Sequence, residues 1–136
     1  MERRLFQLII GLLSLVPLAN AAIAAGPGIV FFLPEGAPVS VDLDNQFRYL
    51  SGVYLAATFA AWWTLGNIED RMVPFRIVGL AIMAGGVGRV FSIVALGPPT
   101  DPALLVGLVI ELGVVPLLLA WQIRLRRKYR RSFLPM

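Results

Sequence analysis

The chain contains no cysteine and no histidine among its 136 residues. Without cysteine it cannot form a disulfide, use a thiol nucleophile or hold a cysteine-ligated zinc or iron–sulfur centre. Without histidine it lacks the most frequent general base and the usual haem ligand. We therefore expect no metal and no cofactor, and most enzyme mechanisms lose the side chains that they commonly use.

Charged residues are also scarce. They make up 15% of the chain, whereas hydrophobic residues make up 58%. A soluble domain carries about 25% charged and about 45–50% apolar residues. A chain of this length is expected to form one domain, and its composition predicts that this domain lies in a membrane.

Long apolar runs dominate the sequence. A helix needs about 20 apolar residues to cross the hydrocarbon core of a bilayer. Four segments meet or approach this length, at about residues 5–25, 49–66, 75–97 and 103–123, with an outer loop at 26–48 and a basic tail at 124–136. The sequence therefore predicts an all-α fold, a single membrane domain that forms an antiparallel four-helix bundle.

Several residues are typical of helix ends. Asp42 or Asp44 is placed to cap the second predicted helix, and the 97–99 Gly-Pro-Pro stretch to end the third. Asp101, followed by a proline, has the pattern of a cap for the fourth helix. These signals predict a short turn between the third and fourth helices, so the two should be antiparallel neighbours.

The basic residues predict the orientation. Ten of the twelve lysines and arginines lie near the N-terminus, between the second and third segments, or after the fourth. The positive-inside rule then places both termini of this multi-pass protein in the cytoplasm. A signal peptide ending near Ala21 is the alternative, and would leave three spans. The apolar run exceeds a usual signal core, which favours a span.

The arginine-rich tail, residues 124–136, raises the question of its partner. A basic segment can bind nucleic acid, but this one directly follows a predicted span. Juxtamembrane basic residues are typically attracted to anionic lipid head groups. We expect membrane lipids, and no nucleic acid, as its partners.

Two charged residues fall inside predicted spans, where charges are costly and usually face the protein interior. At 1.5 Å per residue, Arg89 lies about 12 Å below the outer end of its helix and Glu111 about 13 Å below the outer end of the next. We therefore expect an Arg89–Glu111 ion pair. It could only lock helix register, or it could belong to a ligand or proton site. Pro116 frees the carbonyl of Leu112 beside this pair.

Arg48 stands at the outer boundary of the second predicted span, near acidic residues. It could be an interfacial cation paired with Asp42 or Asp44. Alternatively, Arg48 and Arg89 could form an outward-facing anion site in which Glu111 orients Arg89. Residues at helical spacing on either side of Arg48 could line such a site: Asp44, Ser51, Tyr54 and Thr58.

Three stretches of the chain carry a family resemblance. They are Asp44-Asn45 with 48–52 (Arg-Tyr-Leu-Ser-Gly), residues 85–92 (Gly-Gly-Val-Gly-Arg-Val-Phe-Ser) and Glu111-Leu112. On these the sequence, over roughly residues 5–122, resembles a bacterial family of short four-helix membrane proteins known as a domain of unknown function (DUF4345). The resemblance implies the same fold and a bacterial inner membrane. It draws attention to Arg48, Arg89 and Glu111 but implies no activity.

Three functions are compatible with these observations. The first is a non-catalytic accessory or scaffold component of a larger membrane complex or homo-oligomer, which the small size and small-residue helix faces favour. The second is a binding protein for a lipid or anionic amphiphile that uses Arg48, Arg89 and Glu111. The third is a membrane enzyme acting on a lipid-like substrate with Glu111 as acid or base. The sequence shows no nucleophile–base pair, so the third is least favoured.

Overall fold

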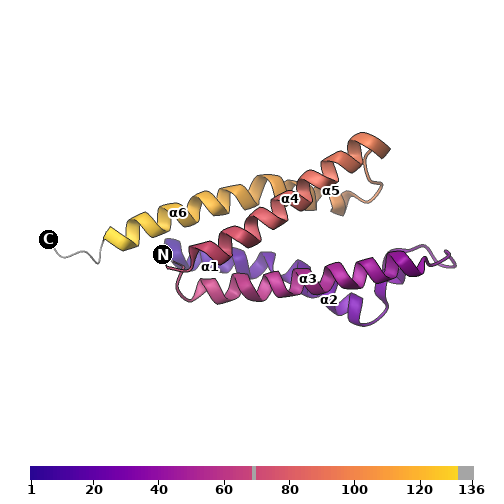
Figure 1. Ribbon diagram of the computed structural model, residues 1–136, viewed down its shortest axis with the longest axis horizontal. Coiled ribbons are helices and arrows are strands. Elements are labelled where there is room, and N and C mark those ends of the chain that lie inside the picture. Colours follow the sequence, from indigo (N-terminus) through magenta and orange to yellow (C-terminus); the bar gives the residue numbers. More distant parts are fainter. Residues whose placement is uncertain (69, 132–136) are drawn as a thin grey trace. The chain divides into compact units, whose positions relative to one another are not determined.

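The computed structural model describes residues 1–68 and 70–131 (Figure 1). Over these residues the chain is helical and has no strand, which confirms the all-α prediction. The elements, in chain order, are α1 (Glu2–Leu13), α2 (Leu15–Ala25), the 3₁₀ helix η1 (Gly28–Phe32), α3 (Val41–Leu65), α4 (Met72–Leu96), α5 (Pro102–Val109), the π-helical turn η2 (Ile110–Val114) and α6 (Val115–Arg131).

Three helical stretches are long and apolar enough to cross a membrane: Glu2–Ala25, Met72–Leu96 and Pro102–Lys128. Helix α3 is equally long at 25 residues. Its first two turns carry Asp42, Asp44 and Arg48, and it is not among the three. The fourth span, expected at residues 49–66, therefore stays a prediction.

The chain divides into two compact units. Apart from the first two residues, unit 1 comprises residues 3–63 and unit 2 begins at residue 64. Unit 1 contains α1, α2, η1 and all but the last two residues of α3, and unit 2 contains α4, α5, η2 and α6. Each unit is a helical hairpin and is described by itself.

In unit 1 the first helical stretch is interrupted at Ser14, between α1 and α2. Pro17 causes the interruption, because it has no N–H to bond the carbonyl of Leu13. The Ser14 hydroxyl donates to the carbonyl of Ile10 at 2.6 Å and accepts the indole N–H of Trp62 at 2.9 Å. The break thus ties α1 to α3.

Helix α3 begins at Val41, eight residues before the predicted span. The backbone N–H of Leu43 donates to Ser40 Oγ at 3.3 Å, so Ser40 caps this helix. The predicted caps, Asp42 and Asp44, were wrong, because both lie inside the first turn, where acidic side chains interact favourably with the helix dipole.

In unit 2 both predicted helix ends at the tight turn are confirmed. Helix α4 ends at Leu96, and Gly97 follows with a φ of 92°, a left-handed conformation that favours glycine. Asp101 Oδ1 accepts the backbone N–H of Ala103 at 2.9 Å, and Pro102 is the first helical residue of α5. The turn therefore brings α4 and α5 into an antiparallel hairpin.

Two glycines allow α4 to pack closely on the last helix. A Cβ added at Gly79 would lie 2.8 Å from Leu119 Cδ2, and one at Gly86 would lie 2.9 Å from Leu112 Cδ2. These positions are seven residues apart, so they lie two turns along one face. In a membrane, where lipid tails weaken the hydrophobic drive between helices, such small residues permit close backbone contact.

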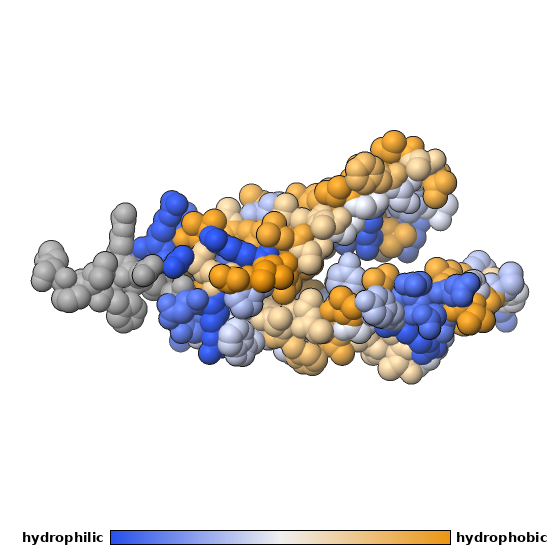
Figure 2. All heavy atoms as spheres, in the orientation of Figure 1, coloured by the Kyte–Doolittle hydropathy of each residue, from blue (hydrophilic) through white to orange (hydrophobic). Residues whose placement is uncertain are grey.

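Helix α6 continues beyond the predicted span. It runs to Arg131, so the first part of the predicted tail extends the helix, and residues 132–136 lie outside the described part. Figure 2 shows hydrophobic side chains over the α4–α5 hairpin and hydrophilic ones toward the C-terminal end of α6. Apolar residues thus give way to basic ones along one uninterrupted helix.

Candidate functional site

Arg89 and Glu111 lie together in unit 2. Arg89 Nε is 3.2 Å from Glu111 Oε2, with 40% of the arginine side chain exposed but only 11% of the glutamate side chain. Glu111 Oε2 is shielded from solvent and makes no hydrogen bond with a described residue. The two partners therefore differ in exposure, because the carboxylate is buried and the cation is half-exposed.

The backbone at Glu111 is unusual. Glu111 lies within the π-helical turn η2, which contains one more residue than an α-helical turn. Pro116 follows two residues after η2 and cannot donate a hydrogen bond to the carbonyl of Leu112. π-Helical turns inside α-helices occur frequently at functional sites.

The arginine reaches Glu111 across a glycine. A Cβ added at Gly107 on α5 would stand 3.5 Å from Arg89 Nη1, so the guanidinium lies against this part of α5. Gly86 lies on the other side of the pair, where an added Cβ would come within 3.0 Å of the Glu111 Cβ. The two glycines leave space for a close charged contact between helices.

A pocket of about 170 Å³ adjoins Arg89 near the turn between α4 and α5. Its wall combines one cation, one hydroxyl and mostly apolar groups: Arg89, Ser92, Ile93, Gly97, Pro99, Leu104 and Leu108. Arg89 and Ser92 are therefore the two polar side chains that line a concave, largely apolar space.

Arg48, in unit 1, has closer partners. Its Nε lies 2.7 Å from Asp44 Oδ2, and its Nη1 donates to the carbonyl of Ala24 at the end of α2. Asp44 Oδ1 also accepts the backbone N–H of Ile29 at 2.9 Å. We call these four residues the loop clasp, because they fasten the segment after α2 to the start of α3.

Gly28 completes the loop clasp. Its φ is 69°, and an added Cβ would overlap Asp44 Oδ1 and the guanidinium of Arg48. Both the conformation and the lack of space therefore require glycine here. The Asp44 carboxylate and Arg48 guanidinium are packed against bare backbone.

The loop clasp also affects the ionisation of Asp44. The hydrogen bond from Arg48, then that from the Ile29 amide, hold the pKa of Asp44 below its usual value, against a smaller opposing effect of desolvation. Hydrogen bonds that favour the charged form act in this direction. Asp44 thus stays ionised as the acceptor of two donors.

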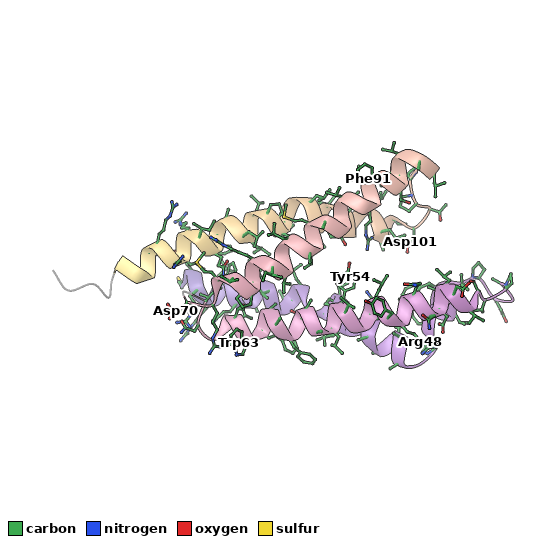
Figure 3. The ribbon with its side chains drawn as sticks, in the orientation of Figure 1. Arg48, Tyr54, Trp63, Asp70, Phe91 and Asp101 are labelled. Atoms are coloured by element: carbon green, nitrogen blue, oxygen red, sulfur yellow. The ribbon has the colours of Figure 1, made fainter. Side chains whose placement is uncertain are left out.

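The other residues predicted to line a site lie along α3. Ser51 and Thr58 are buried, and Tyr54 is partly exposed on a different side of the helix from Arg48 (Figure 3). The Thr58 hydroxyl donates to the backbone carbonyl of Tyr54 at 2.8 Å. A hydroxyl engaged with its own helix in this way is occupied locally.

The predicted joint site of Arg48 and Arg89 stays a prediction, because the two arginines belong to different units. Unit 1 brings Arg48 and Asp44 together, and unit 2 brings Arg89 and Glu111 together. In the part of the chain that the structure describes, no three acidic side chains come close enough to hold a metal ion.

Sequence reasoning missed two features. The first is the apolar wall of the pocket. In the sequence its residues, including Leu104 and Leu108, are indistinguishable from other residues of a span. Gln122 is fully buried in α6, and its side-chain nitrogen and oxygen have no hydrogen-bond partner among the described residues. Its signal was present in the sequence as a lone amide near the end of an apolar run.

These helices define the class of protein. Three apolar helices of membrane-spanning length and a charged pair on two of them are the features of a helical membrane protein. The family model described as "Domain of unknown function (DUF4345)" matches residues 5–122, so the chain belongs to that family. No curated protein and no solved structure matches the chain.

Proposed function

We propose that this membrane protein binds the head group of an anionic amphiphile in the pocket beside Arg89. The observation that carries the proposal is the Arg89 side chain, which is 40% exposed and lines a 170 Å³ pocket with otherwise mostly apolar walls. Ligand sites typically combine an apolar surface with a few polar groups that fix orientation. An amphiphile offers both complements, a charged head and an apolar chain.

The chemistry of the pair supports binding rather than catalysis. A guanidinium presents N–H groups in a fixed planar fork that matches an oxyanion. Glu111 occupies the Nε side of Arg89 and so holds the fork in one orientation. Glu111, the acid or base of the enzyme alternative, is not among the residues that line the pocket. The enzyme alternative is therefore less favoured.

The proposed location is the inner membrane of a bacterium, with both termini in the cytoplasm. The basic residues along the last helix and beside the N-terminus support this orientation. Because the chain has no cysteine, single cysteines introduced at position 2 and at position 35 can be labelled with an impermeant maleimide. Labelling of position 35 only, in intact cells, is expected; labelling of position 2 would contradict the orientation.

Native mass spectrometry of the protein extracted with its surrounding lipid tests the binding proposal. We expect an amphiphile adduct on the unaltered chain and its loss in Arg89→Gln. Arg76→Gln is the matched control, because it removes an exposed arginine from the same helix thirteen residues away. Equal adducts on both variants would contradict the proposal.

An accessory role is the second candidate. Gly88 on α4 favours it, because a Cβ added there would meet nothing within 4 Å, so no described side chain covers this small residue. Uncovered small residues let another membrane helix approach closely. In the same native mass spectra, a stable complex with other polypeptides and no amphiphile adduct would favour this role over the first.

A further inference from the structure

The size of the pocket limits its ligand. A volume of 170 Å³ is close to that of a cavity of about 150 Å³, which is known to hold one benzene. A carboxyl group with the first four or five carbons of a chain fits this space. A glycerophosphate head group carries its esterified glycerol and second chain close to the charge, and these would have to remain outside the pocket.

The charge of the pocket limits the ligand further. Arg89 is the one charged residue among those that line it, and its charge is already balanced by Glu111. In the described elements packed against Glu111, the nearest other basic residues are Arg76 on α4 and Arg124 on α6. Arg76 is thirteen residues from Arg89, and Arg124 is thirteen residues from Glu111. At 1.5 Å per residue, each separation is about 20 Å. A phosphomonoester, which can carry two negative charges, would find one cation among the unit 2 residues that line the pocket, already partnered by Glu111.

We infer that the pocket binds the carboxylate of a single-chain amphiphile, such as a fatty acid, which shares or replaces Glu111 on the guanidinium of Arg89. This inference rests on the proposed function and narrows its ligand class. The carboxylate would meet the exposed side of Arg89 and the Ser92 hydroxyl. Ile93, Leu104 and Leu108 would contact the first carbons, and the rest of the chain would leave the pocket into lipid.

Glu111 then has a positioning role with a measurable signature. Its buried carboxylate holds Arg89, but it also places a negative charge beside the site of an incoming anion. Like charges around one guanidinium oppose each other. Replacing Glu111 with the neutral, similarly shaped glutamine should therefore strengthen carboxylate binding, whereas a merely structural role would weaken it or leave it unchanged.

The test uses hexanoate, a soluble probe of about the pocket's capacity, with a ¹³C label on its carboxyl carbon. The protein is placed in nanodiscs of zwitterionic lipid at about pH 8, where the probe is ionised. Binding is followed by the carboxyl ¹³C shift, with far-UV circular dichroism as the folding check. We expect saturable binding, at least 10-fold weaker in Arg89→Gln, unchanged in Arg76→Gln and several-fold tighter in Glu111→Gln.

Two competitors separate failure of the inference from failure of the proposed function. Hexyl phosphate should displace the labelled hexanoate at least 10-fold less well than unlabelled hexanoate does. Hexanol, which has no charge, should displace it poorly. If hexyl phosphate binds as tightly as hexanoate, and its binding is lost in Arg89→Gln, the carboxylate inference is overturned while anion binding stands. If no anion binds with dependence on Arg89, or hexanol competes equally, both are overturned. Weaker hexanoate binding in a folded Glu111→Gln variant would overturn the role of Glu111.

Discussion

Arg48 in unit 1 and Arg89 in unit 2 have similar sequence settings but different surroundings. Each has an acidic partner and a glycine nearby. Arg48 bonds both Asp44 and a backbone carbonyl, and the backbone of Gly28 packs against it. Arg89 has the buried Glu111 on one side and an open pocket on the other.

Under the proposed function, this difference separates a structural arginine from one that binds a ligand. The guanidinium of Arg48 is engaged by a carboxylate and a carbonyl within its own unit, so it fastens the loop. Arg89 faces the buried Glu111, whose Oε2 makes no hydrogen bond with a described residue, and it also lines the pocket.

Breaking the loop clasp should have the largest effect. Gly28→Ala introduces a Cβ that overlaps Asp44 and Arg48 at a φ of 69°. We expect the free energy of unfolding, measured by titration with dodecyl sulfate, to fall by about 2–5 kcal/mol, combining about 1–2 for the left-handed conformation with about 1–3 for the overlap.

Gly36→Ala is the matched control for this substitution. Gly36 has a similar φ of 75° but has nothing within 4 Å of an added Cβ. It should show the conformational cost alone, about 1–2 kcal/mol. Equal losses in the two variants would mean that the loop clasp contributes nothing beyond backbone conformation.

Breaking the unit 2 pair should have an intermediate effect. Arg89→Gln leaves the buried Glu111 carboxylate without a cation, and we expect a loss of about 1–3 kcal/mol. This is below the roughly 3–5 of a fully buried pair, because 40% of Arg89 is exposed. Adding Glu111→Gln should restore most of the loss, measured by the same titration as a double-mutant cycle.

The corresponding cycle in unit 1 sharpens the contrast. Adding Asp44→Asn to Arg48→Gln should restore little of the lost free energy of unfolding. The reason is that Asp44 also accepts the Ile29 amide and Arg48 also donates to the carbonyl of Ala24. If both cycles gave the same coupling, the two arginines would not differ in the way that their contacts indicate.

The smallest effect is a pH dependence of the loop clasp. The folded pKa of Asp44 lies below its usual value of 3.8. The carboxylate therefore stabilises the loop above that value, and the contribution is lost as the pH falls through it toward the lowered folded pKa. We expect hydrogen-exchange protection of the Ile29 amide, corrected for intrinsic rate, to decrease over this interval. The protection should become pH-independent in Asp44→Asn, whereas the Gly97 amide, bonded to the carbonyl of Ile93, should be unaffected in both proteins.

The parts that could be predicted from sequence depend on local chemistry. Apolar runs give the helices, and Gly97 and Asp101 mark the α4–α5 turn because left-handed backbone and helix capping are properties of single residues. The nearness of Arg89 and Glu111 follows from counting residues along two helices joined by a short turn. None of these inferences requires knowledge of a loop path.

The parts that were missed depend on how the chain travels between helices. The bond from Arg48 to the carbonyl of Ala24, and the requirement for Gly28 beside it, arise from the path of residues 26–40. The pocket is equally invisible in sequence, because its apolar walls, such as Leu104 and Leu108, have the composition of any span. The start of α3 at Val41 required a choice among several polar candidates for the cap.

The π-helical turn η2 can also be regarded as a dislocation in the helical lattice. An extra residue in one turn can in general migrate along a helix, one residue at a time, by exchange of hydrogen-bond partners. In a regular α-helix the ring of Pro116 would clash with the carbonyl of Leu112, and a wider turn before the proline gives this carbonyl room. Pro116 therefore favours the defect on its own N-terminal side, in the stretch that carries Glu111.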